Sequence, residues 1–169
     1  MSFFAVNAVV SFVVALVLHE LGHYVAARIC GVPIKQAGFG WGPKIYGVKV
    51  GTVDCHLRLL PVGAYVQMDI GALQRRPLLQ QLFVLGAGIG VNLVLCVLTW
   101  GSLFGVFNLA LAIGNLIPVY QLDGWKGGMV ICRRLFGRRS PVVEWMFTLG
   151  GGAMGLIFVL WSLVFVIRT

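Results

Sequence analysis

The feature that most constrains this chain is a series of long apolar segments. Of its 169 residues, 59% are hydrophobic and only 11% are charged, whereas an ordinary soluble domain is about 25% charged. The apolar runs approach the roughly 20 residues that a helix needs to cross a bilayer core, where the backbone polar groups must be satisfied within the protein. We therefore expect an α-helical integral membrane protein with about four transmembrane helices, at residues 3–29, 77–100, 102–122 and 142–167.

The segment between the first two predicted helices, residues 31–76, has a different pattern. KIYGVKV and VDCHLRLL alternate in polarity, and turn signals lie at GWGP (40–43) and GT (51–52). Alternation with a period of two is typical of strands in hairpins. We predict a small membrane-associated β-hairpin or sheet insert after the first helix, on the cytoplasmic side. His56 falls on the polar face of the second segment, which predicts a solvated position.

The distribution of positive charge predicts the orientation. Twelve of the thirteen Lys and Arg residues lie within residues 28–76 and 126–139, and the turn between the second and third helices has none. By the positive-inside rule both of these connections are cytoplasmic, so both termini face outward. The positive charges lie beside apolar runs, and they therefore indicate contact with anionic lipid headgroups rather than with nucleic acid.

The whole chain, residues 1–169, is expected to form a single membrane domain with one further short helix. Residues 124–137 combine basic and apolar side chains, which predicts an interfacial helix. Its apolar side chains would enter the headgroup boundary: Trp125, Met129, Val130 and Phe136.

The sequence LVLHELGHYVAA places three ionisable side chains inside the first apolar run. His19 and His23 are four residues apart and share one face of a helix, so both rings can bind one ion. Glu20 projects differently and can reach a water on that ion, as in the HExxH arrangement of metalloproteases. Each ionisable group at a bilayer centre costs about 2.5–3.5 kcal/mol, which favours a compensating metal ion over a chance match.

A catalytic zinc site usually has a third protein ligand. Among the few acidic residues, Asp123 alone ends a predicted membrane pass. Pro118 lacks a backbone donor and Gly124 permits a sharp turn, so the helix is expected to break there. His19 lies roughly 24 Å along the first helix from its outer end, at 1.5 Å per residue, which places it at the cytoplasmic depth of Asp123. We predict that Asp123 is the third ligand; the alternative is a plain turn aspartate.

These motifs together resemble the site-2 protease family of intramembrane zinc metalloproteases, peptidase family M50. The similarity includes HELGH (19–23) and the stretch from Asn115 through Pro118 to LDG (122–124). LLPVGAYVQM is similar to the family's Pro-x-Gly-Gly-Tyr-Val segment, and AGIGVN (87–92) is similar to its AGPxxN segment. Ile89 replaces the proline of the latter motif, and no predicted ligand position is lost.

The resemblance implies a function and a set of roles. The chain would be a zinc metalloendopeptidase with one catalytic Zn2+, which cleaves a transmembrane protein substrate within or near its membrane segment. Glu20 would be the catalytic base. Asn115 would contact the substrate or transition state, with helix packing as the alternative, and Asn92 would be structural. The length suggests a compact prokaryotic cell-membrane member without PDZ or CBS domains.

Two other classes of function are compatible with polar residues in a membrane helix. A zinc or proton-coupled transporter could use the same side chains as a transit site. A catalytically silent membrane scaffold is the third interpretation. The intact HExxH and LDG motifs favour the protease.

Overall fold

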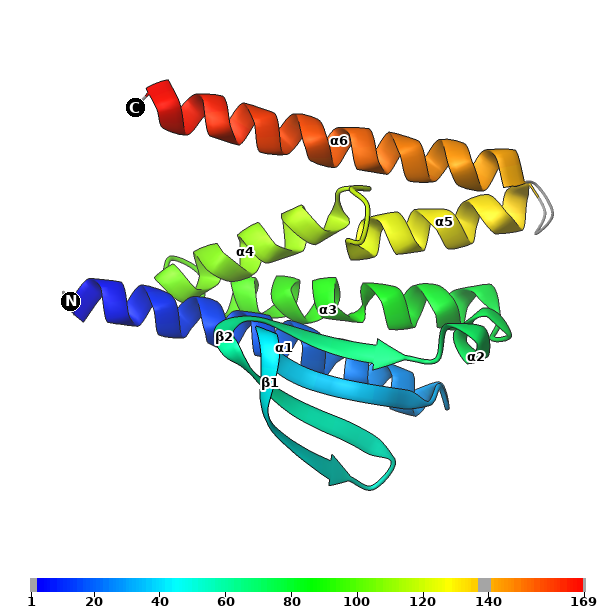
Figure 1. The fold of residues 1–169 in the computed structure, drawn as a ribbon, viewed down its shortest axis with the longest axis horizontal. Coiled ribbons are helices and arrows are strands. Elements are labelled where there is room, and N and C mark those ends of the chain that lie inside the picture. The colour runs from blue at the N-terminus through cyan, green and yellow to red at the C-terminus, as the bar shows by residue number, and fades with distance from the viewer. Residues whose placement is uncertain (1–2, 137–140, 169) are drawn as a thin grey trace. The chain divides into compact units, whose positions relative to one another are not determined.

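The computed structural model describes residues 3–136 and 141–168. It divides into two compact units, Met1–Ile113 and Gly114–Thr169. Figure 1 labels the helices and strands of both units.

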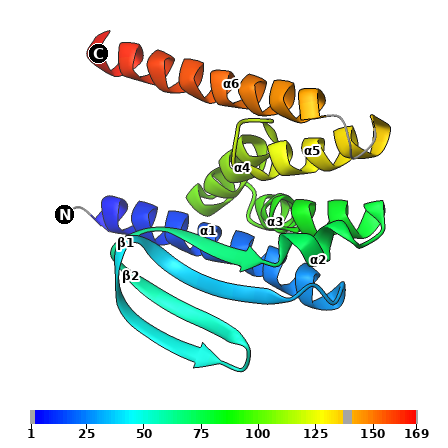
Figure 2. The ribbon, with the colours of Figure 1, turned by 45° about the vertical axis from the view of Figure 1, so that its right-hand side comes forward.

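The longer helices of the first unit are α1 (Phe3–Ile29), α3 (Leu78–Leu98) and α4 (Leu103–Leu116), and the last three residues of α4 belong to the second unit. Within the described residues, α1 and α3 are long and apolar enough to cross a membrane, and α4 is a shorter apolar helix. Helices α1 and α3 lie side by side (Figures 1 and 2). They approach closely because residue 22 is glycine, where a Cβ atom would lie only 2.9 Å from the carbonyl oxygen of Ala87.

Strands β1 (Ile34–Val50) and β2 (Val53–Met68) form an antiparallel sheet that contacts α1. Gln36 pairs with both Gln67 and Asp54, so the first part of β1 lies between two parts of β2 (Figure 2). The predicted β insert is therefore present, and its turn at residues 51–52 is confirmed.

The predicted turn at GWGP is wrong, because β1 continues through it. Gly40 and Gly42 have φ angles of +97° and +88°, and glycine adopts this region readily. The register of the two strands shifts repeatedly around these residues, as expected where a strand bends. The chain thus bends within one long strand instead of reversing between two short ones.

A short helix that the sequence did not indicate, α2 (Ile70–Gln74), connects the sheet to α3. The Asp69 carboxylate caps it by accepting a hydrogen bond from the Ala72 backbone N–H at 2.9 Å. Lys35 forms an ion pair with the same carboxylate at 3.1 Å. The Ala72 hydrogen bond, followed by Lys35, lowers the pKa of Asp69 below its ordinary value.

The second unit contains α5 (Asp123–Leu135) and α6 (Pro141–Arg168), which contact each other. Arg133 donates two hydrogen bonds to the Glu144 carboxylate, at 2.7 and 3.0 Å. The Trp125 ring lies 6.4 Å from the ring of Phe147 on α6. Of the four side chains predicted to enter the headgroup boundary, Met129 does not fit that role because it is buried, whereas Trp125 is half-buried.

The predicted third membrane helix, residues 102–122, is shorter in the structure, because α4 ends at Leu116. Pro118 follows two residues later and has no N–H to continue the helix. Gln121 then adopts a φ of 79°, which is uncommon for a residue other than glycine. This irregular segment ends where α5 begins.

Candidate metal centre

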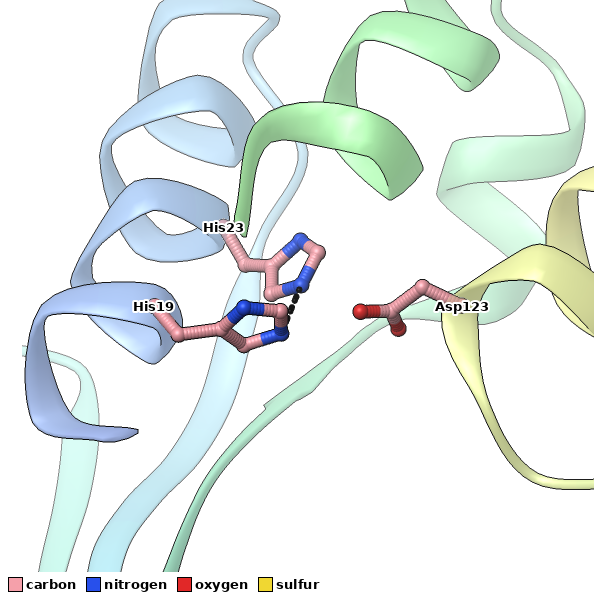
Figure 3. A group of neighbouring side chains, drawn as sticks. All are labelled: His19, His23 and Asp123. Atoms are coloured by element: carbon pink, nitrogen blue, oxygen red, sulfur yellow. Dashed lines mark hydrogen bonds between the residues drawn. The ribbon is translucent and has the colours of Figure 1, made fainter. Parts of the chain in front are cut away.

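His19 and His23 lie on the buried face of α1, one helical turn apart. Their exposed fractions are only 3% and 5%. Their Nε2 atoms point toward each other and lie 3.3 Å apart (Figure 3). The predicted pairing of the two imidazoles is therefore present in the first unit.

The Nδ1 atom of each imidazole has a defined partner on α3. His23 Nδ1 donates to the backbone carbonyl of Val84 at 2.8 Å. His19 Nδ1 forms a short hydrogen bond with Oδ1 of Asn92, which is fully buried. Both partners accept hydrogen bonds, so both histidines carry their proton on Nδ1. Metal-binding histidines are usually held in this way by a carbonyl or carboxylate on the other ring nitrogen.

The position of the proton on Nδ1 determines what each facing Nε2 atom can do. A neutral ring has one N–H and one lone pair, so with Nδ1 protonated each Nε2 carries a lone pair. The two Nε2 atoms lie 3.3 Å apart, close enough for both to bind one cation. Zinc binds imidazole nitrogen at about 2.0–2.1 Å, so the two rings fit one such ion.

Gly88 on α3 provides space beside these two nitrogens. A Cβ atom at this position would lie 2.5 Å from Nε2 of His23 and 2.7 Å from Nε2 of His19. Any side chain here would therefore occupy the position of an ion. The sequence alone gave Gly88 no role of its own beyond its place in AGIGVN.

Asp123, the predicted third ligand, lies in the second unit. It opens α5 and is 7% exposed, and Figure 3 shows its carboxylate on the first turn of that helix. Lys126 donates to its Oδ1 at 3.0 Å, one turn along α5. The buried carboxylate is thus oriented from within its own helix.

Gly124 brings the start of α5 against the end of α4. A Cβ atom there would lie 2.9 Å from the backbone oxygen of Asn115 and would clash with that of Leu116. The predicted turn at Gly124 is therefore a close backbone approach, which places Asn115 next to the helix that carries Asp123.

Glu20, next to His19 on α1, lines a groove between α1 and the sheet. The groove has a volume of about 430 Å³ and is mostly apolar. Its helical wall also includes Val17 and Tyr24, and its sheet wall includes Tyr46, Val48, Cys55, His56 and Tyr65. The prediction that His56 is solvated is wrong, because His56 is half-buried and its Nδ1 lies 3.3 Å from the hydroxyl of Tyr65.

Within the described residues, fold and site together define a helical protein with two apolar helices of membrane-spanning length and a candidate metal site in an HExxH motif. The sequence model of Peptidase family M50 matches residues 7–106, more than half of the chain. The chain belongs to peptidase family M50, as its motifs predicted.

Two relatives named "Putative zinc metalloprotease" are similar to this chain. The protein from Clostridium perfringens is 34% identical over 103 residues, which cover 56% of this chain and 31% of the relative. The protein from Neisseria meningitidis is 31% identical over 144 residues, which cover 76% of this chain and 32% of the relative. The chain therefore spans about a third of the length of the curated relatives that it matches.

Proposed function

We propose that this chain is an intramembrane zinc metalloprotease, which hydrolyses a peptide bond within or near the transmembrane segment of a membrane protein. One observation carries the proposal: two buried imidazoles present their Nε2 lone pairs to each other at 3.3 Å, with Glu20 on the same helix. Membership of family M50 supports the same reaction.

His19 and His23 would hold one Zn2+, and Asp123 is proposed as the third protein ligand. The choice of Asp123 is supported by its place in the LDG motif and by its burial, because a buried carboxylate needs a positive partner. Lys126 lies 3.0 Å from this carboxylate, and a divalent cation bound here would be a further positive partner.

The side chains divide the work of hydrolysis. Zinc bound at this site supplies Lewis acidity toward a water and the scissile carbonyl. The Glu20 carboxylate accepts a proton from the attacking water and delivers one to the leaving amine nitrogen. The Asn115 amide, held beside α5 by the contact at Gly124, is proposed to donate to the developing oxyanion.

The groove beside Glu20 is the proposed substrate site. A helical segment cannot expose its peptide bond, because its backbone is already hydrogen-bonded, so it must be extended locally. The groove presents apolar side chains that suit an apolar membrane segment. In the part of the chain that the structure describes, residues 46–50 pair with β2 along one edge only. An extended substrate can add to a sheet edge as a further strand.

The proposed orientation places the centre toward the cytoplasmic side of a multi-pass protein, with about four passes and both termini outside. The support is the concentration of Lys and Arg in the two connections. The same residues would contact anionic headgroups on that side.

The test is co-expression with candidate single-pass proteins, comparing the wild type with Glu20→Gln. We expect cleavage by the wild type and a loss of at least 100-fold in the variant, since general base catalysis contributes about 10²–10⁴-fold. Zinc content should be about one ion per chain in both, because Glu20 is not a proposed ligand. Equal cleavage by the two proteins would refute the proposal.

A further inference from the structure

We propose that Asn108 is a positioning residue of the metal centre, which acts through Asn92 to hold His19 in its metal-binding tautomer. This inference rests on the proposed metal site. It concerns a residue of α4 that lies outside every motif described above.

Asn108 is the far end of a hydrogen-bond chain that crosses three helices. Its Nδ2 donates to the backbone carbonyl of Phe104 at 2.8 Å. Its Oδ1 accepts from Nδ2 of Asn92 at 2.7 Å. Asn92 Oδ1 in turn contacts Nδ1 of His19. Both asparagines are 0% exposed, so neither amide can exchange these partners for water.

The donor and acceptor directions of these hydrogen bonds are fixed by the one to Phe104. A backbone carbonyl can only accept, so the Asn108 amide must present its NH₂ group to Phe104 and its oxygen to Asn92. Asn92 must then present its NH₂ group to Asn108 and its oxygen to His19. With an acceptor at Nδ1, His19 carries its proton there and keeps the Nε2 lone pair for a metal.

The two histidines differ in what fixes the proton on their Nδ1 atoms. His23 donates to the Val84 carbonyl, a backbone group that cannot turn around. His19 depends on an amide side chain, and rotating that amide by 180° would present a donor instead of an acceptor. A donor at Nδ1 would move the His19 proton to Nε2, which removes that lone pair. Asn108 prevents the rotation, because it offers Asn92 an acceptor only.

The experiment compares Asn108→Leu with Asn108→Asp, and uses Cys96→Ala as the packing control. Leucine keeps the volume and removes both hydrogen bonds. A buried aspartic acid is kept neutral, so its O–H can donate to Phe104 while its carbonyl oxygen accepts from Asn92. Cys96 is buried one turn beyond Asn92 on α3, and its side chain takes no part in the chain of amides.

Two quantities are measured on purified protein in lipid nanodiscs. The first is the dissociation constant for zinc, obtained by competition with a chelator. The second is the ¹⁵N NMR shift of the imidazole nitrogens in zinc-free protein, which distinguishes the two tautomers. The chain has three histidines, so single substitutions are sufficient for assignment.

We expect Asn108→Leu to weaken zinc binding about 10–100-fold, the usual cost of losing an indirect partner of a ligand, and to give His19 an Nε2–H population. Asn108→Asp and Cys96→Ala should resemble the wild type in both measurements. A wild-type tautomer in Asn108→Leu, or equal losses in all three variants, would overturn the inference. The tautomer needs neither zinc nor substrate, so a wild type that cleaves nothing would refute the proposed function and leave this test intact.

Discussion

At the scale of single residues, the metal centre depends on hydrogen-bond acceptors and on empty space. The acceptors at Val84 and Asn92 place both histidine protons on Nδ1. The space comes from Gly88, which lets α3 approach the imidazoles without a side chain. These features are what the proposed binding of a metal by the two histidines of α1 requires.

Replacing Gly88 with alanine is predicted to abolish the site. The added Cβ would lie 2.5–2.7 Å from both Nε2 atoms, where an ion would have to sit, and α3 cannot withdraw without separating from α1. We expect the zinc affinity and the cleavage rate to fall by more than tenfold, about 1.4 kcal/mol or more. Metal analysis and a cleavage assay measure the two effects.

Gly90→Ala is the matched control, because it adds the same methyl group to the same helix. A Cβ atom at Gly90 meets nothing within 4 Å, so zinc content and cleavage should stay at wild-type levels. Wild-type zinc affinity in Gly88→Ala would show that the ion is bound elsewhere.

At the scale of elements, α1 contacts α3 with one face and the sheet with another. One face carries the histidines against α3, and the adjacent side carries Glu20 into the groove beside the sheet. Because Glu20 follows His19 directly, it projects about 100° around the helix. The HExxH spacing thus connects the proposed metal site to the proposed substrate groove through one rigid helix.

Val48→Asp is predicted to impair cleavage without loss of zinc. Val48 lies in the sheet wall of the groove, and a carboxylate there would be desolvated by an apolar substrate segment. We expect cleavage to fall about tenfold, which corresponds to about 1.4 kcal/mol, while zinc content stays unchanged. The rate is measured with a purified single-pass substrate.

The control for this change is Val50→Asp. Val50 is two residues along the same strand, is 61% exposed, and does not line the groove. Its substitution should leave the rate near the wild-type value. If both variants are equally impaired, general damage to the sheet explains the loss and the groove is not the substrate site.

At the scale of the whole molecule, the bilayer sets the orientation through the positive charges. The connection that contains the sheet and the connection that contains α5 are basic, whereas the turn between α3 and α4 has no Lys or Arg. Lys and Arg are retained on the cytoplasmic side. The sheet, and with it the groove, is therefore predicted to face the cytoplasm.

Cysteine labelling tests this orientation. In a variant without its four native cysteines, Thr52→Cys should be protected from an impermeant maleimide in intact cells, and Trp100→Cys should be labelled. Both positions are exposed, at the sheet turn and after α3. Permeabilised cells should label both equally. Labelling of residue 52 alone in intact cells would reverse the proposed topology.

The sequence by itself determined the class of protein, because apolar runs, charge bias and the HExxH and LDG motifs depend on local spacing and composition. His19 and His23 could be identified as candidate ligands because four-residue spacing places them on one helix face, and Glu20 as a candidate base because it completes the HExxH motif. The bounds of α1 and the presence of a sheet followed in the same way. The sequence could not predict that β1 is one long bent strand rather than two short strands, because glycine permits either a turn or a bend.

Only the tertiary structure decided how the histidines are held. Asn92 is 73 residues from His19 in the chain, and Asn108 is a further 16 residues away. Nothing in local periodicity shows that their side chains meet, or that Gly88 faces two imidazoles. These relations arise from the packing of α1, α3 and α4, where buried amides must find partners on other helices because lipid offers none.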